Sequence, residues 1–386
     1  MKLLLVHQYF KTPDEGSGIR SWYIARALSH AGHDVTVISG HSAYEGFREM
    51  EKVKVRYFKI PYDNRFGFYK RIWAFFSFVR KSKSFIDQNP DFQHAYLLST
   101  PLSVGYIGLY LKKKHNIPYT FEVGDLWPAA PVQLGMIRFP WLVGYLQNLE
   151  QKIYKNANRL VALSPAIRDY MEYTIDYTMQ VDVVTNMSDC VFFKPGQVVL
   201  NLPDATRPFV IVYAGAFGYA NHLTYLLDVA KLAISRNMPL HFHLMGDGRE
   251  LQSLQMQAKV CNNVTFHSWG GKEQVRELLN QCHAVYISYL KNPILETGSP
   301  NKLFDGLAAG KMILFNGKGW IKKLIETHEC GIYHDPESPG MLLDSLEPFL
   351  KSPALIEHYQ ENARVLAETQ FEVSKQTQRV VSFFDT

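Results

Sequence analysis

Short runs of apolar residues alternate along the chain with longer segments in which apolar residues recur every three or four positions. The first apolar run, residues 3–7, has the length of a buried strand, and residues 20–30 have the spacing of an amphipathic helix. Gly32 follows where a helix commonly ends, and residues 35–39 form the next buried run. The pattern predicts a strand–helix–strand unit with parallel strands.

The same alternation continues through the chain and starts afresh after residue 208. The predicted strands cover residues 53–60, 94–99, 119–123 and 160–163 in the first half, and residues 209–213, 240–245, 264–267 and 284–288 in the second. Predicted helices lie between them, at 69–82, 102–113, 143–155, 224–235, 250–260 and 272–282. This order indicates an α/β fold, in which helices cover both faces of a parallel sheet.

Chain length and a polar, proline-containing stretch indicate two domains. With 386 residues the chain is too long for one ordinary domain and suits two of nearly equal size. We expect a Rossmann-like domain over residues 1–195, a second one over residues 196–365, and a final helix, residues 366–386, that returns to the first domain. Ligands bind outside the carboxyl ends of the strands in such sheets, so two domains that face one another predict a ligand cleft between them.

Composition and charge are those of an ordinary globular protein with one basic region. Hydrophobic residues make up 47% of the chain and charged residues 20%, and the net charge of +5 excludes a polycation. Between Lys52 and Lys83, however, many lysines and arginines accompany a single acid, Asp63. Residues 65–83 of this region are also rich in aromatic side chains.

Residues 65–83 have three interpretations. A helix with aromatic rings and clustered cations suits the interface of an anionic bilayer, where the rings dip in and Lys and Arg lie at headgroup level. The segment equally suits a helix that faces the core of the first domain and has a solvated basic end. A nucleic-acid surface is the third interpretation, but nothing else in the chain supports it, and we expect no nucleic-acid partner.

The cysteines and the N-terminus favour a reducing, cytoplasmic location. The four cysteines lie far apart, with neither metal-ligand spacing nor the density of a disulfide scaffold: Cys190, Cys261, Cys282 and Cys330. The first ten residues lack a small-residue cleavage site and are expected to form a strand rather than a signal peptide. Pro101 and Gly105 interrupt the apolar stretch 94–111, which favours a strand, a turn and a helix over a membrane span.

A glycine-rich loop lies between the first predicted strand and helix, at residues 14–20. Its glycines let backbone N–H groups approach a ligand, and the N-terminus of the following helix favours anions. The spacing is not G-x-G-x-x-G, the spacing of a dinucleotide-binding loop. The alternative is a flexible turn in which Ser17 or Ser21 caps the helix.

Two acids, Glu122 and Asp125, stand at the end of a predicted strand, before the stiff pair Trp127 and Pro128. An acid at the carboxyl edge of a strand faces the ligand side of the sheet, where it can bind hydroxyl groups or act as a base. The alternative is that Asp125 simply caps the next segment.

The third motif, residues 295–310, is a loop rich in glycine, serine and asparagine that leads into a helix beginning near Lys302. The free N–H groups of that helix, together with Lys302, suit a diphosphate. Asp305, one turn later, is expected on the same side, where a carboxylate accepts hydrogen bonds from ribose hydroxyls. The alternative is a plain capped helix with an ion pair between Lys302 and Asp305.

Taken together, these motifs resemble those of the retaining GT-B glycosyltransferases of family four. The nearest likeness is to bacterial polysaccharide-assembly enzymes (O-antigen and capsule), which have DLWP after a mid-domain strand and donor loops like residues 299–305. The resemblance covers essentially the whole chain. Further matching segments are residues 25–35, 164–165, 185–189, 213–218 and 246–248.

The resemblance implies a role for each matching residue. The first domain would receive the acceptor and the second the nucleotide sugar. Glu296 would hold hydroxyls of the donor sugar, Asp305 the ribose, and Lys302 the diphosphate. Four residues around the start of the helix near Lys302 would share in diphosphate binding through their backbone: Gly298, Ser299, Pro300 and Asn301. Gly16 and Gly18 would approach the same phosphates, and loops near Gly218, Gly248 and Trp269 would cradle the base. We expect Asp125, Glu296 and Lys302 to take part in catalysis.

Two departures from the family pattern stand out. The usual pair of glutamates is separated by seven residues, whereas Glu296 and Asp305 are separated by eight, and the second acid is an aspartate. The basic pair that many relatives have after the first strand of the second domain is missing. His222 is the one candidate in that segment, and Arg249 is a candidate substitute for the pair.

The implied activity is retaining transfer of a hexosyl or related sugar, with N-acetylated and deoxy sugars as candidates, from a UDP- or GDP-sugar. The acceptor would be a saccharide or a polyprenyl-diphosphate-linked saccharide in bacterial surface polysaccharide (lipopolysaccharide or capsule) synthesis. No cofactor and no protein-bound metal are expected, and the protein would be cytoplasmic or peripheral on the inner face of the plasma membrane. Two alternatives remain: a GT-B-shaped nucleotide-sugar epimerase and an inactive GT-B scaffold subunit.

Overall fold

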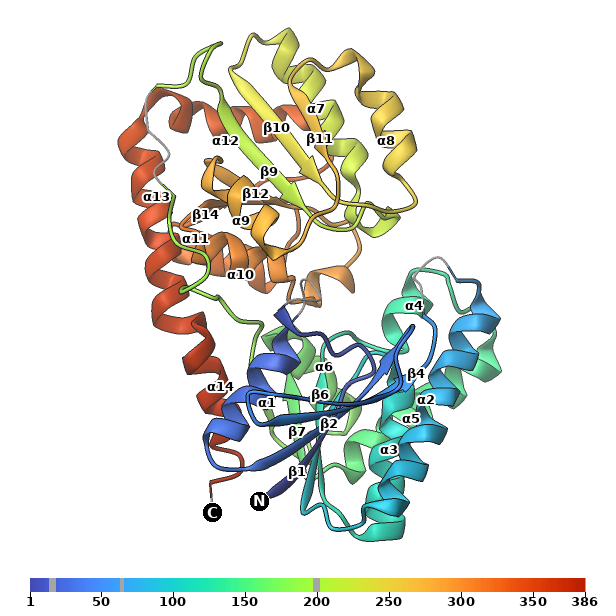
Figure 1. Ribbon diagram of the computed structural model, residues 1–386. Coiled ribbons are helices and arrows are strands. Elements are labelled where there is room, and N and C mark those ends of the chain that lie inside the picture. Colours follow the sequence, from blue (N-terminus) through green and yellow to red (C-terminus); the bar gives the residue numbers. More distant parts are fainter. Residues whose placement is uncertain (14–18, 63–65, 197–201, 386) are drawn as a thin grey trace. The chain divides into compact units, whose positions relative to one another are not determined.

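The computed structural model describes residues 1–13, 19–62, 66–196 and 202–385. The chain folds into two compact units, which we call unit 1 (Met1–Thr185 with Gln376–Thr386) and unit 2 (Asn186–Lys375). In each unit helices lie on both sides of a central sheet (Figure 1). The expected α/β class with two parallel-sheet domains is confirmed.

The sheet of unit 1 has the strand order β3-β4-β2-β1-β5-β6-β7-β8. All neighbours are parallel except β3 and β4, which are antiparallel. The strands are β1 (Lys2–Val6), β2 (Asp34–His41), β3 (Gly46–Met50), β4 (Val53–Lys59), β5 (His94–Leu98), β6 (Tyr119–Val123), β7 (Arg159–Ala162) and β8 (Val181–Val183). Because β1, β5 and β6 are central and covered on both faces, they are almost entirely buried, as their continuous apolar runs predict.

The helices of unit 1 connect these strands. They are α1 (Arg20–His30), α2 (Phe68–Gln88), α3 (Gly105–Tyr110), α4 (Ala129–Gln133), α5 (Pro140–Asn156) and α6 (Pro165–Thr174). A short 3-10 turn (Leu102–Val104) opens α3, and a π-helical turn (Leu111–His115) ends it. The final helix α14 (Val373–Val381) groups with unit 1 from Gln376 onward.

The sheet of unit 2 is wholly parallel, in the order β11-β10-β9-β12-β13-β14. Its strands are β9 (Phe209–Ala214), β10 (Leu240–Met245), β11 (Val264–His267), β12 (Ala284–Ile287), β13 (Met312–Phe315) and β14 (Gly331–Tyr333). Its helices are α7 (Leu223–Ser235), α8 (Leu251–Gln257), α9 (Lys272–Asn280), α10 (Asn301–Ala308), α11 (Trp320–Thr327), α12 (Pro339–Lys351) and α13 (Pro353–Leu366).

Each face of the unit 2 sheet has its own core because side chains along a strand alternate between faces. Ile211 and Tyr213 of β9 pack with α7 and α12 on one face. Val212, between them, packs on the other face with residues of α9, α10, α11 and α13. The sheet therefore fixes the helices on both of its sides.

The two units divide between Thr185 and Asn186, before the boundary expected from the sequence. The segment after the division is tied to unit 2, because Ser188 Oγ donates to the carbonyl of Phe304 at 2.9 Å and Arg364 Nη1 donates to that of Phe193 at 2.7 Å. The four cysteines are buried free thiols. Within the described ranges, no helix is long and apolar enough to cross a membrane.

A buried carboxyl group in unit 1 gives the protein a pH-dependent stability. Glu150 of α5 is 1% exposed and accepts hydrogen bonds from Tyr154 at 2.9 Å and Tyr170 at 3.2 Å. Burial raises the pKa of Glu150 from 4.5 to about 7, although the two tyrosines oppose the shift. A raised acid pKa means that the folded state holds the proton of Glu150 more tightly than the unfolded state does. The free energy of unfolding therefore decreases as pH rises from about 4.5 to about 7, where only the unfolded state has lost this proton.

We therefore expect Glu150→Gln, which cannot ionise, to gain in stability relative to the wild type by roughly 2–3 kcal/mol between pH 4.5 and pH 8. The difference between the two melting temperatures, measured by calorimetry across this range, tests the expectation. The exposed Glu361, substituted in the same way, should show no such trend. A Glu150→Gln difference that does not change with pH would contradict the raised pKa.

Candidate functional site

In unit 2 the loops after β9, β10, β11 and β12 gather at the carboxyl edge of the sheet, since all these strands are parallel. The loop after β12 leads into α10. Pro300 precedes α10, and no side chain caps its first turn. The first N–H groups of a helix have no partner within the helix and carry a partial positive charge. The start of α10 therefore offers donors to an anion.

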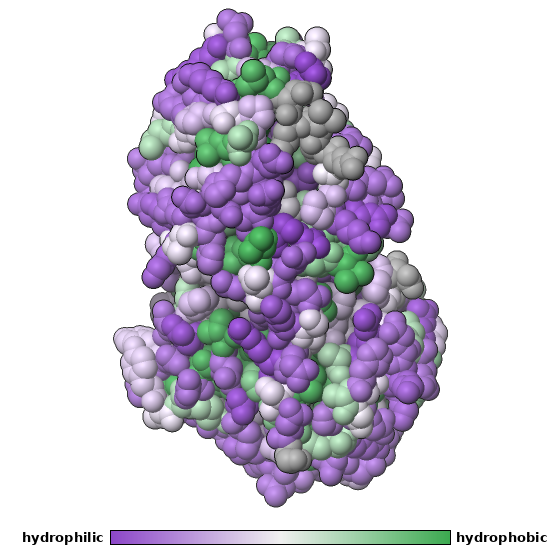
Figure 2. All heavy atoms as spheres, turned by 90° about the vertical axis from the view of Figure 1, so that its left-hand side faces the viewer, coloured by the Kyte–Doolittle hydropathy of each residue, from purple (hydrophilic) through white to green (hydrophobic). Residues whose placement is uncertain are grey.

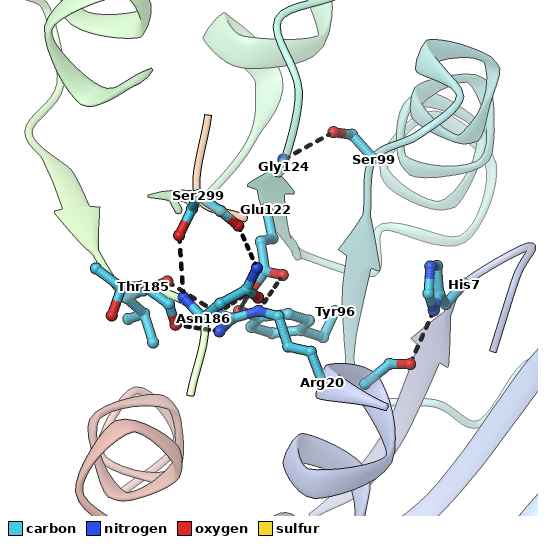
Figure 3. Close-up of polar contacts among 11 residues, drawn as sticks. His7, Arg20, Tyr96, Ser99, Glu122, Gly124, Thr185, Asn186 and Ser299 are labelled. Atoms are coloured by element: carbon cyan, nitrogen blue, oxygen red, sulfur yellow. Dashed lines mark hydrogen bonds and ion pairs between the residues drawn. The ribbon is translucent and has the colours of Figure 1, made fainter. Parts of the chain in front are cut away.

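Hydrogen bonds from other segments of unit 2 hold the loop before α10, which we call the donor loop (residues 295–300). Asn186 Nδ2 donates to the carbonyl of Ser299 at 2.5 Å, as Figure 3 shows. Trp320 Nε1 donates to the carbonyl of Gly298 at 2.9 Å, and the backbone N of Lys318 donates to Glu296 Oε1 at 3.0 Å. The donor loop is therefore fixed at both ends, and part of the Glu296 carboxylate is used for this purpose.

Lys302 is a half-buried cation in the first turn of α10. Its Nζ lies 3.9 Å from the centroid of the Tyr213 ring, and burial lowers its pKa from 10.5 to about 7. Gly215 makes room for it, since a Cβ there would lie 3.0 Å from Nζ. Among the residues that the structure describes, no carboxylate lies within ion-pair distance of Lys302.

Asp305 follows Lys302 by one turn, and these two described residues make no ion pair. The alternative interpretation, a plain capped helix with an ion pair between Lys302 and Asp305, is therefore wrong. Burial raises the pKa of Asp305 from 3.8 to about 7, Lys272 lowers it, and Asp189 raises it further. Lys272 and Asp189 are themselves paired at 2.7 Å. The first turns of α10 thus hold a cation and a carboxyl group that do not neutralise one another.

The glycine loops after β9 and β10 pack directly on one another. A Cβ at Gly248 (φ +156°) would lie 2.3 Å from the carbonyl oxygen of Phe217, and the N of Phe217 donates to the carbonyl of Asp247 at 2.8 Å. Gly248 is therefore required by the packing of the loops. Gly218, by contrast, is open, since the nearest atom to a Cβ there is Asn221 Nδ2 at 3.9 Å.

Arg249 and Trp269 lie at the same sheet edge, on the loops after β10 and β11. Both are exposed, Trp269 to 49%, and in the described part of the chain no interaction links either of them to Lys302 or Asp305. Gly16 and Gly18 lie outside the described residues. Their predicted contribution stays a prediction.

In unit 1 one acid of the second motif is structural. Glu122 accepts two hydrogen bonds from the Arg20 guanidinium, both at 2.8 Å, and one from Tyr96 at 2.5 Å (Figure 3). Arg20 also donates to the carbonyl groups of Val184 and Thr185. This buried cluster fixes the chain where unit 1 ends, and Glu122 is not available to a ligand.

Asp125, the other acid, is exposed beyond the end of β6. Its Oδ2 accepts a hydrogen bond from Thr100 Oγ1 at 3.3 Å. The alternative in which it caps the next helix is wrong, because Pro128 precedes α4 and no side chain caps that helix. Ser21 does not cap α1 either, and its hydroxyl lies 2.8 Å from His7 Nδ1.

Four residues that shape the surroundings of Lys302 and the donor loop were not predicted from the sequence: Tyr213, Gly215, Asn186 and Trp320. Tyr213 and Gly215 lie in a segment that matched the family, residues 213–218, and Asn186 lies in another, residues 185–189. Their contacts with Lys302 and Ser299 join positions far apart in the sequence, so no local pattern reveals them. Within the described residues, no three His, Cys, Asp or Glu side chains are grouped as metal ligands.

Comparisons with known proteins agree with this architecture. Residues 15–186 match the model of a glycosyl transferase 4-like domain, and residues 208–352 match that of the glycosyl transferases group 1. A search among curated proteins gives no significant match.

Several solved structures share the fold over essentially the whole chain. Sucrose-phosphate synthase from Thermosynechococcus elongatus is 14% identical with a TM-score of 0.80, and the match covers 100% of this chain and 98% of that one. HepE from Anabaena in complex with UDP-glucose is 15% identical with a TM-score of 0.71, over 100% and 99% of the two chains. WaaG, a glycosyltransferase involved in lipopolysaccharide biosynthesis, is 14% identical with a TM-score of 0.71, over 99% of each chain. The two family matches and this fold establish that the chain is a GT-B glycosyltransferase and belongs to family four.

Proposed function

We propose that the chain transfers a sugar from a nucleoside diphosphate donor and that unit 2 binds this donor at the start of α10. One observation carries the proposal: Lys302 is a half-buried cation with no carboxylate partner among the described residues, next to N–H groups that no side chain caps. A diphosphate supplies the negative charge that both features attract. UDP-glucose bound to HepE supports a uridine nucleotide as the donor.

The chemistry follows from where charge develops. As the bond between the sugar and the diphosphate breaks, negative charge grows on the departing phosphate oxygens. Lys302 and the first N–H groups of α10 stabilise that charge, and they are already in place because Tyr213 and the donor loop hold them. Asp305 accepts hydrogen bonds from the ribose, and Glu296 Oε2 from the donor sugar. The acceptor hydroxyl attacks from the face that the diphosphate leaves and gives its proton to the departing phosphate oxygen, so that the anomeric configuration is retained.

We infer that unit 1 receives the acceptor, a saccharide or a polyprenyl-diphosphate-linked saccharide of bacterial surface polysaccharide. The exposed carboxylate of Asp125 supports this role, since it can bind acceptor hydroxyls. The lipopolysaccharide role of WaaG, which shares the fold, is consistent with such an acceptor.

The test is incubation with a panel of UDP- and GDP-sugars, with and without lipid extract, while release of the nucleoside diphosphate is followed. Release that requires the lipid fraction supports the transferase. Formation of an epimer without lipid would show the epimerase instead, and binding without turnover would show a scaffold.

A further inference from the structure

An exposed aromatic stripe runs along α2 of unit 1. The core face of this helix is buried through Ala74, Phe75 and Phe78. The opposite face carries large rings in water: Tyr69 (86% exposed), Trp73 (60%) and Phe76 (53%). Their spacing of four and three residues places them on one side of the helix. The helix thus faces the core and also leaves a second apolar face uncovered.

A second group of exposed apolar side chains lies at the start of α5. Trp141 is 72% exposed and Tyr145, one turn later, 53%. Phe139 and Met136, just before the helix, are exposed as well. Full burial of α5 begins only in its second half, at Leu149.

The two groups are continuous through α3. The ring of Tyr106 lies 6.2 Å from that of Phe76, and the hydroxyl of Tyr106 is hydrogen-bonded to that of Tyr145. Figure 1 shows α2, α3 and α5 close together, and α3 packs against both neighbours. We call this set the aromatic surface: Tyr69, Trp73, Phe76, Tyr106, Met136, Phe139, Trp141 and Tyr145.

The segments that carry the aromatic surface also carry exposed cations. The sequence has no acid between Asp63 and Asp87, nor between Asp125 and Glu150. Within these stretches Lys70, Arg80 and Arg138 are exposed, and none of the three has a carboxylate partner among the described residues. Arg65 lies outside the described residues.

Exposed rings so close together are unusual on a soluble surface, where hydrophobic residues occur singly. The face that carries α13 shows the usual distribution for comparison, since it is mostly hydrophilic and its apolar patches are small and separate (Figure 2). A second copy is a poor partner, since a symmetric contact would set cations against cations. Trp and Tyr beside Lys and Arg are instead the side chains that settle at the headgroup level of a bilayer.

We propose that the aromatic surface docks on an anionic lipid bilayer. The rings of Trp73, Trp141 and Tyr69 enter the boundary between headgroups and acyl chains, and the cations contact lipid phosphates. This docking surface adds a membrane contact to the proposed function. It rests on that function only in linking the membrane to a lipid-linked acceptor. Vesicle binding and UDP binding are separate measurements, so either proposal can fail alone.

The experiment is co-sedimentation of the full chain with vesicles of phosphatidylglycerol and phosphatidylcholine in equal parts, and with vesicles of phosphatidylcholine alone. We expect the wild type to sediment with the first and only weakly with the second. Trp73→Gln with Trp141→Gln should lower the partition coefficient about tenfold or more. Lys70→Gln, Arg80→Gln and Arg138→Gln together should remove the preference for anionic vesicles.

The matched control is Tyr173→Gln with Tyr177→Gln, two exposed rings of unit 1 outside the aromatic surface (71% and 69% exposed). It should bind vesicles as the wild type does, and all variants should keep the wild-type melting temperature. The proposal fails if the wild type stays in the supernatant or if the tryptophan variant sediments unchanged. It also fails if the wild type is a dimer in solution that the tryptophan variant separates, because the surface would then be a subunit interface.

Discussion

Lys302→Ala is expected to lower kcat/KM for the nucleotide sugar about 10²-fold or more, because the variant removes a cation aimed at the charge that develops on the leaving diphosphate. Affinity for the free nucleoside diphosphate should fall as well, by about tenfold or more, since a charge-assisted hydrogen bond is lost. Removal of the ammonium group loses its contact with the Tyr213 ring but also relieves the cost of burying a charge, and no ion pair is broken among the described residues, so stability should change little. Titration calorimetry with UDP and steady-state kinetics measure the two effects.

Lys259→Ala is the matched control, since this lysine is exposed in the same unit and lies outside the candidate site. It should bind UDP as the wild type does. If Lys302→Ala retained wild-type affinity and turnover, the diphosphate would have to bind elsewhere.

Because of the lowered pKa of Lys302, we expect the affinity of the same site for UDP to depend on pH. With a pKa of about 7 in the free protein, Lys302 is charged below neutrality and loses its charge above it. Affinity for UDP should therefore decline as pH rises from about 7, by up to about tenfold per unit. Lys302→Arg keeps its charge throughout this range, so its affinity should not show the decline. An identical decline in both proteins would assign the titration to another group.

Gly215→Ala has the second large effect that we expect. Gly215 has φ +155°, and an added Cβ would lie 3.0 Å from Lys302 Nζ and 3.4 Å from the hydroxyl of Tyr213. Backbone strain at such a position costs about 1–3 kcal/mol, and the methyl group pushes the ammonium away from its place. We expect UDP affinity to fall about tenfold or more, with a lower melting temperature for unit 2.

Gly67→Ala serves as the control for the added methyl group, because Gly67 has φ −64° and nothing lies within 4 Å of a Cβ there. That variant should bind UDP normally. Normal binding by Gly215→Ala would mean that the place of Lys302 beside Tyr213 does not matter for the donor.

Much of the fold could be predicted from the sequence because buried parallel strands and amphipathic helices leave strong local patterns. The runs that became β1, β5, β6 and β9 are examples. The edge strands β3, β8 and β14 were missed, since β3 is largely exposed and β8 and β14 have three residues each. The four-residue buried strand β13 was missed as well. The division between units depends on contacts such as Ser188 with Phe304, which join residues distant in sequence.

The part of the candidate site that is formed by residues close together in the sequence could be predicted. Lys302 and Asp305 lie one turn apart on the expected helix, and the donor loop precedes them. The structure alone reveals that they do not pair, that Tyr213 and Gly215 surround the ammonium, and that Glu122 is used by Arg20. Such properties arise from packing between strands and loops, which a single sequence does not record.

The most direct test of the account is a crystal structure of the protein with UDP. We predict that the β-phosphate lies within hydrogen-bonding distance of Lys302 Nζ and of the first N–H groups of α10, with the ribose hydroxyls at Asp305. A nucleotide bound with its diphosphate away from α10, leaving Lys302 beside Tyr213 without a phosphate contact, would contradict the proposed donor site.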